Sequence, residues 1–447
     1  MERGVPNALV RPQSQTSAFG TTRSTHFSRT MPHLVPFEPH PLLVLDQVAP
    51  SANKLRIGPR IGPCENHDKE IDGALNMQYL TRRRFISTLS TAAASLLMTH
   101  RLRASDEPGS TRRLGIAFVG LGNYATNELA PAVRLSRRWR IAGVVTGNRA
   151  KGLSWATHDK FPERNVFDYA NMGELMHCPE IDVVYVVTPN GLHAEHTIAA
   201  AKAGKHVICE KPMATSIQEC DAMIEACNAM DRRLLIGYRL HYEPDNIEFA
   251  RMARERVFGN FTRTSGANGF DMAMDRSAKN FWRLNRRLAG GGPLMDMGVY
   301  VIQASCTAKA EAPPVSVIAS FGKVTRPRLF SQVEQSVDWT MEFGDGSTAQ
   351  CSTSYAAQVS RFRADGEKGW AEFVYPAFYY DKPVLTTSRG PVNLPAVNQQ
   401  LAQLDAMAME ISTGAASLAP ATMGRRDVSI ITAVYEAART GRRVAVV

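Results

Sequence analysis

One short stretch constrains the fold of this chain more than any other. An apolar run, Leu114–Val119, is followed by Gly120-Leu121-Gly122-Asn123-Tyr124-Ala125 and then by a helical pattern. A buried strand, a G-x-G-x-x-A turn and a helix in this order are typical of a dinucleotide-binding unit. Gly120 permits the tight turn, Gly122 lets the backbone approach a pyrophosphate, and Ala125 lets the helix pack closely on the strand.

The alternation of strand and helix continues after this unit. Apolar runs over Ile141–Val145, Ile181–Val187 and His206–Cys209 indicate further strands, and Ala194–Ala203 indicates a helix. Such alternation predicts a doubly wound parallel sheet in an α/β fold. We therefore expect a Rossmann domain over residues 112–236, with ligands at the carboxyl edge of its sheet.

The end of the second predicted strand bears on the choice of nucleotide. Enzymes that use NAD usually carry an Asp or Glu here for the ribose hydroxyls, whereas this chain has Thr146. Arg149 and Lys151 follow, and both could pair with a 2′-phosphate. The sequence favours NADP as the cofactor. The alternative is that the two cations are ordinary charges on a helix surface.

Two loops at the same sheet edge carry polar residues. Thr188–His193 follows the third strand, and Glu210-Lys211-Pro212 follows the fourth. We expect Lys211, held by the following proline, to project into the cofactor cleft. The candidates for cofactor binding are Gly120, Gly122, Asn123, Tyr124, Thr146, Arg149, Lys151, Pro189, Asn190, His193, Glu210 and Lys211.

The second half of the chain has a different pattern. Alternating segments over Val315–Ser320, Glu334–Phe343, Thr348–Tyr355 and Ala371–Tyr375 predict strands, and residues 398–411 and 425–440 predict helices. We therefore expect an α+β domain over residues 237–447, built on a large open, mainly antiparallel sheet.

Several motifs in this half are specific. Gly237–Pro244 reads G-Y-R-L-H-Y-E-P, Phe281–Leu284 reads F-W-R-L, and Ala289–Tyr300 reads A-G-G-G-P-L-M-D-M-G-V-Y. Together with the glycine turn, the T-P-N-x-L-H loop and E-K-P, they resemble the Gfo/Idh/MocA oxidoreductase family. The family usually has a histidine at the position of Tyr300. A tyrosine there resembles the glucose–fructose oxidoreductase branch of the family. The resemblance implies a sugar substrate, a Lys211 that contacts nicotinamide and substrate, and a second domain that supplies contacts in a homo-oligomer, dimer or tetramer.

The residue types agree with the oxidation of a sugar hydroxyl, which requires a base for the O–H proton. Tyr300 is the candidate base, and a nearby Lys211 ammonium would favour its phenolate form. Asp296, one helical turn earlier, could accept hydrogen bonds from the sugar. The alternatives are a core aromatic for Tyr300 and a helix N-cap for Asp296. Further candidates for substrate binding, each of which could instead be structural, are Tyr238, Arg239, His241, Trp282 and Arg283.

The first hundred residues differ from the rest. Residues 1–76 are rich in Pro, Ser, Thr and His, so we expect a disordered or spurious extension. Within residues 77–104, Thr81-Arg82-Arg83-Arg84-Phe85-Ile86 resembles a twin-arginine export motif, and a short apolar run over 86–98 follows. This run is too short for a stable membrane span. We expect a signal peptide, recognition by the twin-arginine machinery and a periplasmic or otherwise exported protein; the alternative is an amphipathic helix.

Composition narrows the function classes further. The net charge of +10 is concentrated near the front and has no aromatic-interleaved basic motif, which disfavours a nucleic-acid partner. Seven irregularly spaced cysteines predict neither a metal site nor a disulfide framework. An exported enzyme has no nucleotide pool, so we expect tightly bound NADP and ping-pong transfer from an aldose to a second sugar. The alternatives are a soluble-cofactor sugar or inositol dehydrogenase and a catalytically silent sugar-binding relative.

Overall fold

The computed structural model describes residues 112–272, 278–374, 377–380 and 383–447. The predicted extension over 1–76 and the twin-arginine segment over 77–104 lie outside these residues. No helix in the described ranges is long and apolar enough to cross a membrane.

The first half forms the doubly wound parallel sheet that the sequence predicts. Its six strands lie in the order β3-β2-β1-β4-β5-β6, so the chain reverses direction across the sheet between β1 and β4. The switch places the ends of β1, β4 and β5 side by side, which is where ligands bind in such sheets. The strands are β1 Leu114–Val119, β2 Trp139–Val145, β3 Val166–Phe167, β4 Val183–Val186, β5 His206–Cys209 and β6 Leu234–Ile236.

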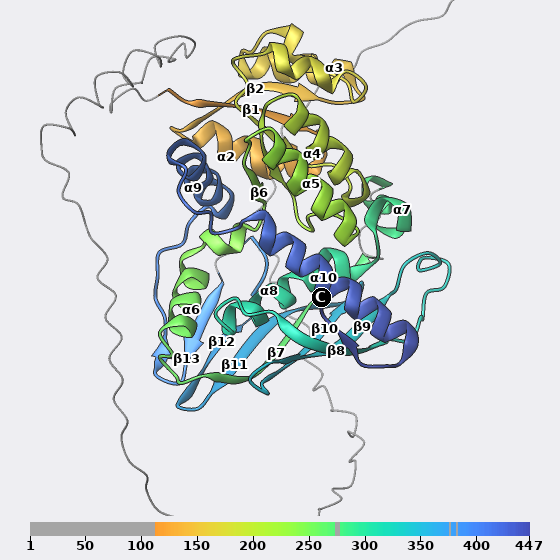
Figure 1. Cartoon of the computed structure of the whole chain (residues 1–447), viewed down its shortest axis with the longest axis vertical. Coiled ribbons are helices and arrows are strands. Elements are labelled where there is room, and N and C mark those ends of the chain that lie inside the picture. Colours follow the sequence, from red (N-terminus) through yellow and green to blue (C-terminus); the bar gives the residue numbers. More distant parts are fainter. Residues whose placement is uncertain (1–111, 273–277, 375–376, 381–382) are drawn as a thin grey trace, which may run out of the picture. The chain divides into compact units, whose positions relative to one another are not determined.

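Helices α3 (Arg149–Asp159), α4 (His193–Lys202) and α5 (Ile217–Ala229) belong to this half (Figure 1). The helix after the glycine turn is irregular: a π-helical turn, Ala125–Leu129, continues into α2 (Ala130–Leu135). Pro131 has no N–H, and its ring would collide with the carbonyl four residues back in a regular helix. The wider turn, closed by the Ala130 N–H on Ala125 O, accommodates it.

The second half is a mixed, mainly antiparallel sheet of nine strands in the order β14-β13-β12-β11-β7-β10-β9-β8-β15. Among the described strands of this sheet, only β7 and β10 pair in parallel. Helices α6 (Pro244–Arg254), α8 (Val299–Ala308) and α10 (Ala421–Thr440) lie on one side of it (Figure 1). The strands are β7 Phe261–Asp271, β8 Pro314–Phe321, β9 Ser336–Phe343, β10 Thr348–Ser354, β11 Ala356–Gly366, β12 Gly369–Val374, β13 Val384–Thr387, β14 Gly390–Pro391 and β15 Val444–Ala445.

Helix α9 (Gln399–Thr413) returns to the first half (Figure 1). The indole of Trp139, fully buried in β2, donates to Leu404 O at 2.7 Å. The Ile236 N–H donates to Ala419 O at 3.0 Å, which extends the edge strand β6. Residues 399–419 therefore complete the Rossmann half, although the predicted division at residue 237 assigns them to the second domain.

Candidate active site

A cavity of about 270 Å³ lies at the carboxyl edge of the parallel sheet, and the second half closes its other side. It brings together the three predicted catalytic residues, although Lys211 lies 85 residues before Asp296 in the chain. The predicted site residues that line it are Tyr124, Asn190, His193, Glu210, Lys211, Arg239, Trp282, Arg283, Asp296 and Tyr300. The first five lie on the Rossmann half or its loops, so the cavity joins the nucleotide edge to the second half.

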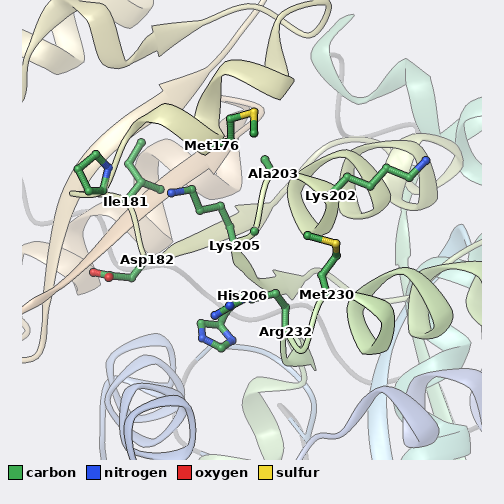
Figure 2. A pocket seen from close by; sticks show the side chains of 11 residues that line it. Met176, Ile181, Asp182, Lys202, Ala203, Lys205, His206, Met230 and Arg232 are labelled. Carbon is green, nitrogen blue, oxygen red and sulfur yellow. The ribbon is translucent and has the colours of Figure 1, made fainter. Parts of the chain in front are cut away.

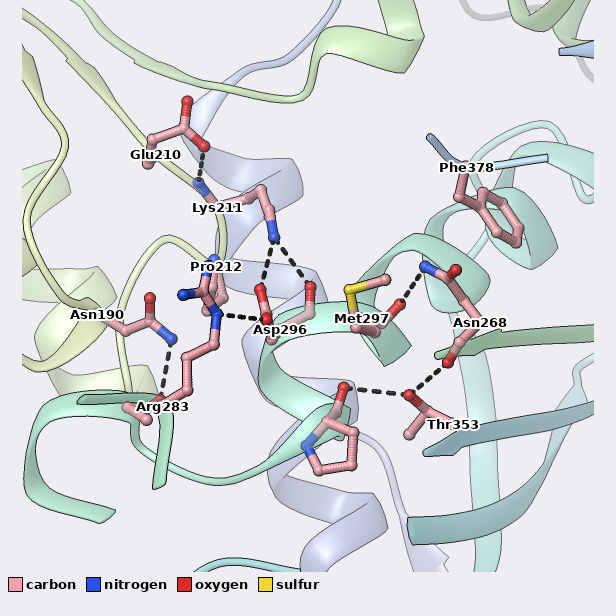
Figure 3. Close-up of polar contacts among 12 residues, drawn as sticks. Asn190, Glu210, Lys211, Pro212, Asn268, Arg283, Asp296, Met297, Thr353 and Phe378 are labelled. Atoms are coloured by element: carbon pink, nitrogen blue, oxygen red, sulfur yellow. Dashed lines mark hydrogen bonds and ion pairs between the residues drawn. The ribbon is translucent and has the colours of Figure 1, made fainter. Parts of the chain in front are cut away.

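Lys211 and Asp296 are bound to each other (Figure 3). Lys211 Nζ lies 3.1 Å from Asp296 Oδ1 and donates to the Asp296 carbonyl oxygen at 2.9 Å. Burial alone would lower the pKa of Lys211, but the negative groups around it outweigh burial and raise that pKa above its ordinary value. Lys211 is therefore a stable cation that points from the end of β5 toward the second half.

Asp296 has two further partners. Arg283 Nε donates to its Oδ2 at 2.8 Å, and the Tyr355 hydroxyl donates to the same oxygen at 3.0 Å. Burial alone would raise the pKa of Asp296, but the Arg283 and Lys211 cations hold it well below its usual range. Asp296 is thus a buried, ionised carboxylate between two cations, and its first effect is to fix Lys211.

A π-helical turn, Leu294–Gly298, delivers Asp296 to the cavity. The sheet supports the carbonyls of this turn, because Asn268 Nδ2 donates to Met297 O at 3.2 Å (Figure 3). Its N-terminus is capped by Glu334, which accepts from the backbone N–H groups of Gly292 and Leu294 at 2.9 and 3.1 Å. The N-cap role considered for Asp296 thus belongs to Glu334, which leaves Asp296 for its ion pairs.

Tyr300 follows in the first turn of α8, and it lines the same cavity. Lys211 Nζ lies 4.7 Å from the centroid of its ring, so the cation faces the aromatic ring while its hydrogen bonds go to Asp296. Within the described part of the chain, the Tyr300 hydroxyl has no hydrogen-bond partner, and it is available to a ligand.

The glycine turn fits a dinucleotide. Gly120 has φ +92°, and a Cβ there would lie 2.9 Å from Val187 O, so only glycine is accommodated. A Cβ on Gly122 would meet nothing within 4 Å, which leaves open space above the turn where a pyrophosphate could approach the backbone. The residues present therefore suit the group that the sequence predicts.

The end of β2 is arranged around Thr146, which is buried. Asn148 caps α3 by accepting from the Lys151 N–H at 3.0 Å, and the first turn of α3 contains no acidic residue. The Lys151 ammonium reaches back to the Leu121 carbonyl in the glycine turn. Arg149 Nη1 donates to Val166 O at 3.4 Å. Two cations and no carboxylate thus begin the helix beside the glycine turn.

Comparison with known proteins identifies the family. Residues 114–238 match the model described as the oxidoreductase family with an NAD-binding Rossmann fold, and residues 248–372 match the GFO/IDH/MocA C-terminal domain. Together these segments cover more than half of the chain. The chain belongs to the GFO/IDH/MocA oxidoreductase family.

Three known proteins of the comparison are similar to this chain over most of their own length. The crystal structure of aldose–aldose oxidoreductase from Caulobacter crescentus, complexed with glycerol, has 36% sequence identity and a TM-score of 0.71, and covers 75% of this chain and 100% of that one. D-xylose 1-dehydrogenase [NADP(+)] of Haloarcula marismortui is 28% identical over 75% of this chain and 93% of its own. D-glucoside 3-dehydrogenase of Escherichia coli is 25% identical over 74% of this chain and 97% of its own.

Some predicted site residues of this GFO/IDH/MocA chain have structural partners. His193 is buried between the carbonyls of Thr188 and Pro212, at 2.8 and 2.9 Å, and Asn190 Nδ2 donates to Ala289 O at 2.9 Å. These bonds tie the third-strand loop to its neighbours. Pro189 precedes that turn without lining the cavity.

Two of the predicted substrate residues lie away from the cavity. Tyr238 is almost fully buried in the core. His241 lines a small neighbouring cavity, and its Nε2 lies 3.2 Å from Gln303 Oε1. Of the G-Y-R-L-H-Y-E-P motif, Arg239 is the residue that reaches the active-site cavity.

Sequence reasoning missed several aromatic residues of the site, among them Tyr355, Phe378 and Tyr380. Tyr355, which holds Asp296, ends a strand whose alternation was recognised, but nothing in its neighbourhood distinguishes it from a core residue. Phe378 and Tyr380 line the cavity from the segment between β12 and β13. They lie far from every recognised motif, so only the folded sheet brings them to the site.

A larger cavity of about 510 Å³ lies at the opposite, amino edge of the parallel sheet (Figure 2). It is lined by residues such as Asp182, Lys205 and Met230. Lys205 Nζ donates to Cys178 O at 2.8 Å, and Asp182 pairs with Arg112 at 2.6 Å. These groups have partners within the protein and lie at the sheet edge opposite to the glycine turn and Lys211, so we place the candidate active site at the smaller cavity.

Proposed function

We propose that this protein is a sugar oxidoreductase that uses NADP, with Tyr300 as its acid–base residue. The observation that carries the proposal is the convergence of Lys211, Asp296 and Tyr300 on one cavity beside the glycine turn. The 36% identity to an aldose–aldose oxidoreductase supports a sugar as substrate, as do the two sugar dehydrogenases. The presence of all three residues disfavours a catalytically silent relative.

A nicotinamide nucleotide held at the glycine turn would supply the acceptor for the hydride of the sugar carbon. Tyr300 takes the proton of the sugar hydroxyl. The Lys211 charge, 4.7 Å from the ring centroid, stabilises the phenolate before the proton arrives. Asp296 holds Lys211 in place, and Arg283 and Tyr355 hold Asp296.

The choice of NADP rests on the residues that begin α3. Arg149 and Lys151 supply positive charge for a 2′-phosphate, and the first turn of the helix has no carboxylate to repel it. The NADP-dependent D-xylose dehydrogenase among the relatives supports this choice.

We further propose that the nucleotide stays bound while two sugars react in turn. An aldose loses two electrons and two hydrogens and leaves as its lactone. A second sugar gains them at its carbonyl carbon and oxygen and leaves as a polyol, with Tyr300 returning the proton. Nucleotide is therefore not consumed.

Spectroscopy and initial rates test this scheme. The purified protein should show nicotinamide absorbance without added nucleotide, and chromatography of the released ligand should give NADP. Double-reciprocal plots with two sugars should be parallel. Intersecting lines with an absolute requirement for added nucleotide would instead support a soluble-cofactor dehydrogenase; two of the relatives are named as dehydrogenases.

Export and assembly are separate proposals. Residues 77–104 would direct the folded protein through the twin-arginine machinery, a proposal that rests on the Arg82-Arg83 pair, Phe85 and the apolar run that follows. Replacing both arginines by lysine should retain the protein in the cytoplasm on cell fractionation.

The mature chain is proposed to form a dimer or tetramer, which light scattering coupled to size-exclusion chromatography would measure.

A further inference from the structure

Arg239 is a buried cation with an incomplete set of partners. It begins a short turn, Arg239–Tyr242, and is only 3% exposed. Its Nη1 donates to Gln399 Oε1 at 2.9 Å and its Nη2 to Phe378 O at 2.7 Å. Both acceptors are neutral. Among the described residues no carboxylate forms an ion pair with Arg239, and its Nε is buried without a hydrogen-bond partner. A buried charge of this kind is costly unless something compensates it.

Aromatic rings surround the guanidinium. Arg239 Cζ lies 4.7 Å from the centroid of the Tyr380 ring and 5.3 Å from that of the Tyr300 ring. Tyr380 in turn stacks on Tyr124 of the glycine turn, with centroids 5.9 Å apart and an interplanar angle of 20°. Rings attract a cation through their quadrupole, but only weakly when they are neutral.

We infer that Arg239 is a positioning residue that stabilises the anionic form of Tyr300, and that this role rests on the proposed function of Tyr300 as acid–base. A phenolate spreads its charge over oxygen and ring, so a cation beside the ring interacts far more strongly with the anion than with the neutral phenol. The interaction therefore grows when Tyr300 loses its proton, which is the difference that helps catalysis. The Tyr300 phenolate would also supply the negative counter-charge that Arg239 otherwise lacks.

A ligand anion is a poorer explanation for the buried charge. Both Nη atoms of Arg239 already donate to acceptors that the fold holds in place. Its Nε is shielded from solvent, so a carboxylate or phosphate group that enters the cavity cannot reach it. At the cavity the guanidinium lies against the rings of Tyr380 and Tyr300, and of these two Tyr300 is the predicted acid–base residue.

Within the described ranges, Lys211 and Arg239 are the two cations whose charges lie beside the Tyr300 ring, and the other titratable groups nearby have partners or shifted pKa values. The Asp296 carboxylate is held by Lys211 and Arg283. Burial raises the pKa of Glu210, against the lowering effect of the Tyr185 hydroxyl and of Lys211, and burial lowers the pKa of His241. The titratable or charged groups that face Tyr300 are Lys211, Arg239, Glu210, Asp296, His241, Tyr124 and Tyr380.

The test compares Arg239→Met and Arg239→Lys with the unchanged enzyme. We follow single-turnover sugar oxidation by reduced-nicotinamide absorbance across pH. In Arg239→Met the acidic limb of the rate profile should move to higher pH by about one to two units, because a unit charge near 5 Å has this effect in a protein interior. At neutral pH the rate should fall about 10–100-fold, with sugar KM and nucleotide fluorescence nearly unchanged. Arg239→Lys should recover part of the shift.

Arg233→Met is the matched control, because Arg233 also donates to two neutral carbonyls, Glu410 O and Ala415 O, but lies outside the cavity. It should leave the pH profile in place. If Arg239→Met does not fold, Tyr380→Leu decides: Tyr380 is half exposed, and its loss admits water that screens Arg239, giving a smaller shift in the same direction.

The possible failures are distinguishable. An unshifted profile in Arg239→Met, or in Tyr380→Leu if the former does not fold, overturns this inference while Tyr300→Phe remains inactive. A Tyr300→Phe variant that keeps full turnover overturns the proposed function itself.

Discussion

Lys211 Nζ makes two hydrogen bonds to Asp296, one to the carboxylate oxygen Oδ1 at 3.1 Å and one to the backbone carbonyl oxygen at 2.9 Å. One partner follows a strand of the parallel sheet, and the other lies in the π-helical turn of the second half. The two halves are therefore joined at the proposed catalytic cluster, and we expect a change to either residue to affect both turnover and the attachment between the halves.

Lys211→Ala and Tyr300→Phe should each reduce turnover by about 10²–10⁴-fold, the usual contribution of an acid–base group. Nucleotide binding, measured by fluorescence titration, should persist because the glycine turn is untouched. Tyr242→Phe is the matched control: it removes a buried hydroxyl that contacts Glu410 outside the cavity. Losses below tenfold in both site variants would exclude these residues from the catalytic roles.

Asp296→Asn should destabilise the protein by about 3 kcal/mol, because it leaves Lys211 and Arg283 buried without their counter-charge. Urea unfolding measures the loss. Asp221→Asn breaks an exposed pair with Arg425 and should cost less than about 1 kcal/mol. Equal effects in the two variants would contradict the electrostatic role of Asp296.

The ion pair also predicts acid sensitivity. The pKa of Asp296 in the folded chain lies well below its unfolded value of about 3.9, so the unfolded state binds a proton first as pH falls. The stabilisation is present above that value and is lost progressively below it. Unfolding curves between pH 5 and 2 should show a shallower decline in Asp296→Asn than in the unchanged protein.

His193 predicts a second pH dependence. Burial lowers its pKa from about 6.5 to about 4, against the opposing effect of the two carbonyls beside it. Because the unfolded chain takes up the proton first, the free energy of unfolding should rise by about 3 kcal/mol between pH 4 and 6.5 and change little above. His193→Gln should flatten this rise. A slope that survives the substitution would assign it to another group.

Thr146→Asp should weaken NADP binding and improve NAD binding, since the new carboxylate repels a 2′-phosphate and can bond the ribose hydroxyls. Dissociation constants for both nucleotides measure the change. Thr157→Asp, which adds the same charge at an exposed position of α3, is the control. If the unchanged protein is isolated with NAD, the argument from Thr146 fails.

The Rossmann half could be predicted from sequence because its signals are local. The bounds of β1 and β5 agree with their apolar runs, Leu114–Val119 and His206–Cys209, since buried parallel strands are continuously hydrophobic. In the second half β7 was not predicted, because its sequence is polar and contains two glycines. Gly266 is there because α8 packs closely: a Cβ would lie 2.7 Å from Val301 Cγ1. Only tertiary structure reveals that requirement.

The meeting of the candidate catalytic residues at one cavity was predictable only in part. Motifs identified Lys211, Asp296 and Tyr300, but they did not show that Lys211 would bind Asp296 and face the ring of Tyr300. That geometry depends on Glu334, which caps the π-helical turn from a distant segment. Contacts between residues far apart in sequence leave no local pattern to recognise.

The bond from Trp139 to Leu404 spans 265 residues. A nascent chain leaving the ribosome exposes β2 long before the helix that covers it has been made. The nucleotide half is therefore finished only near the end of translation. Any chain terminated before residue 399 would leave the Trp139 indole without its acceptor and without the helix that covers it. We therefore expect nucleotide binding to require the completed polypeptide.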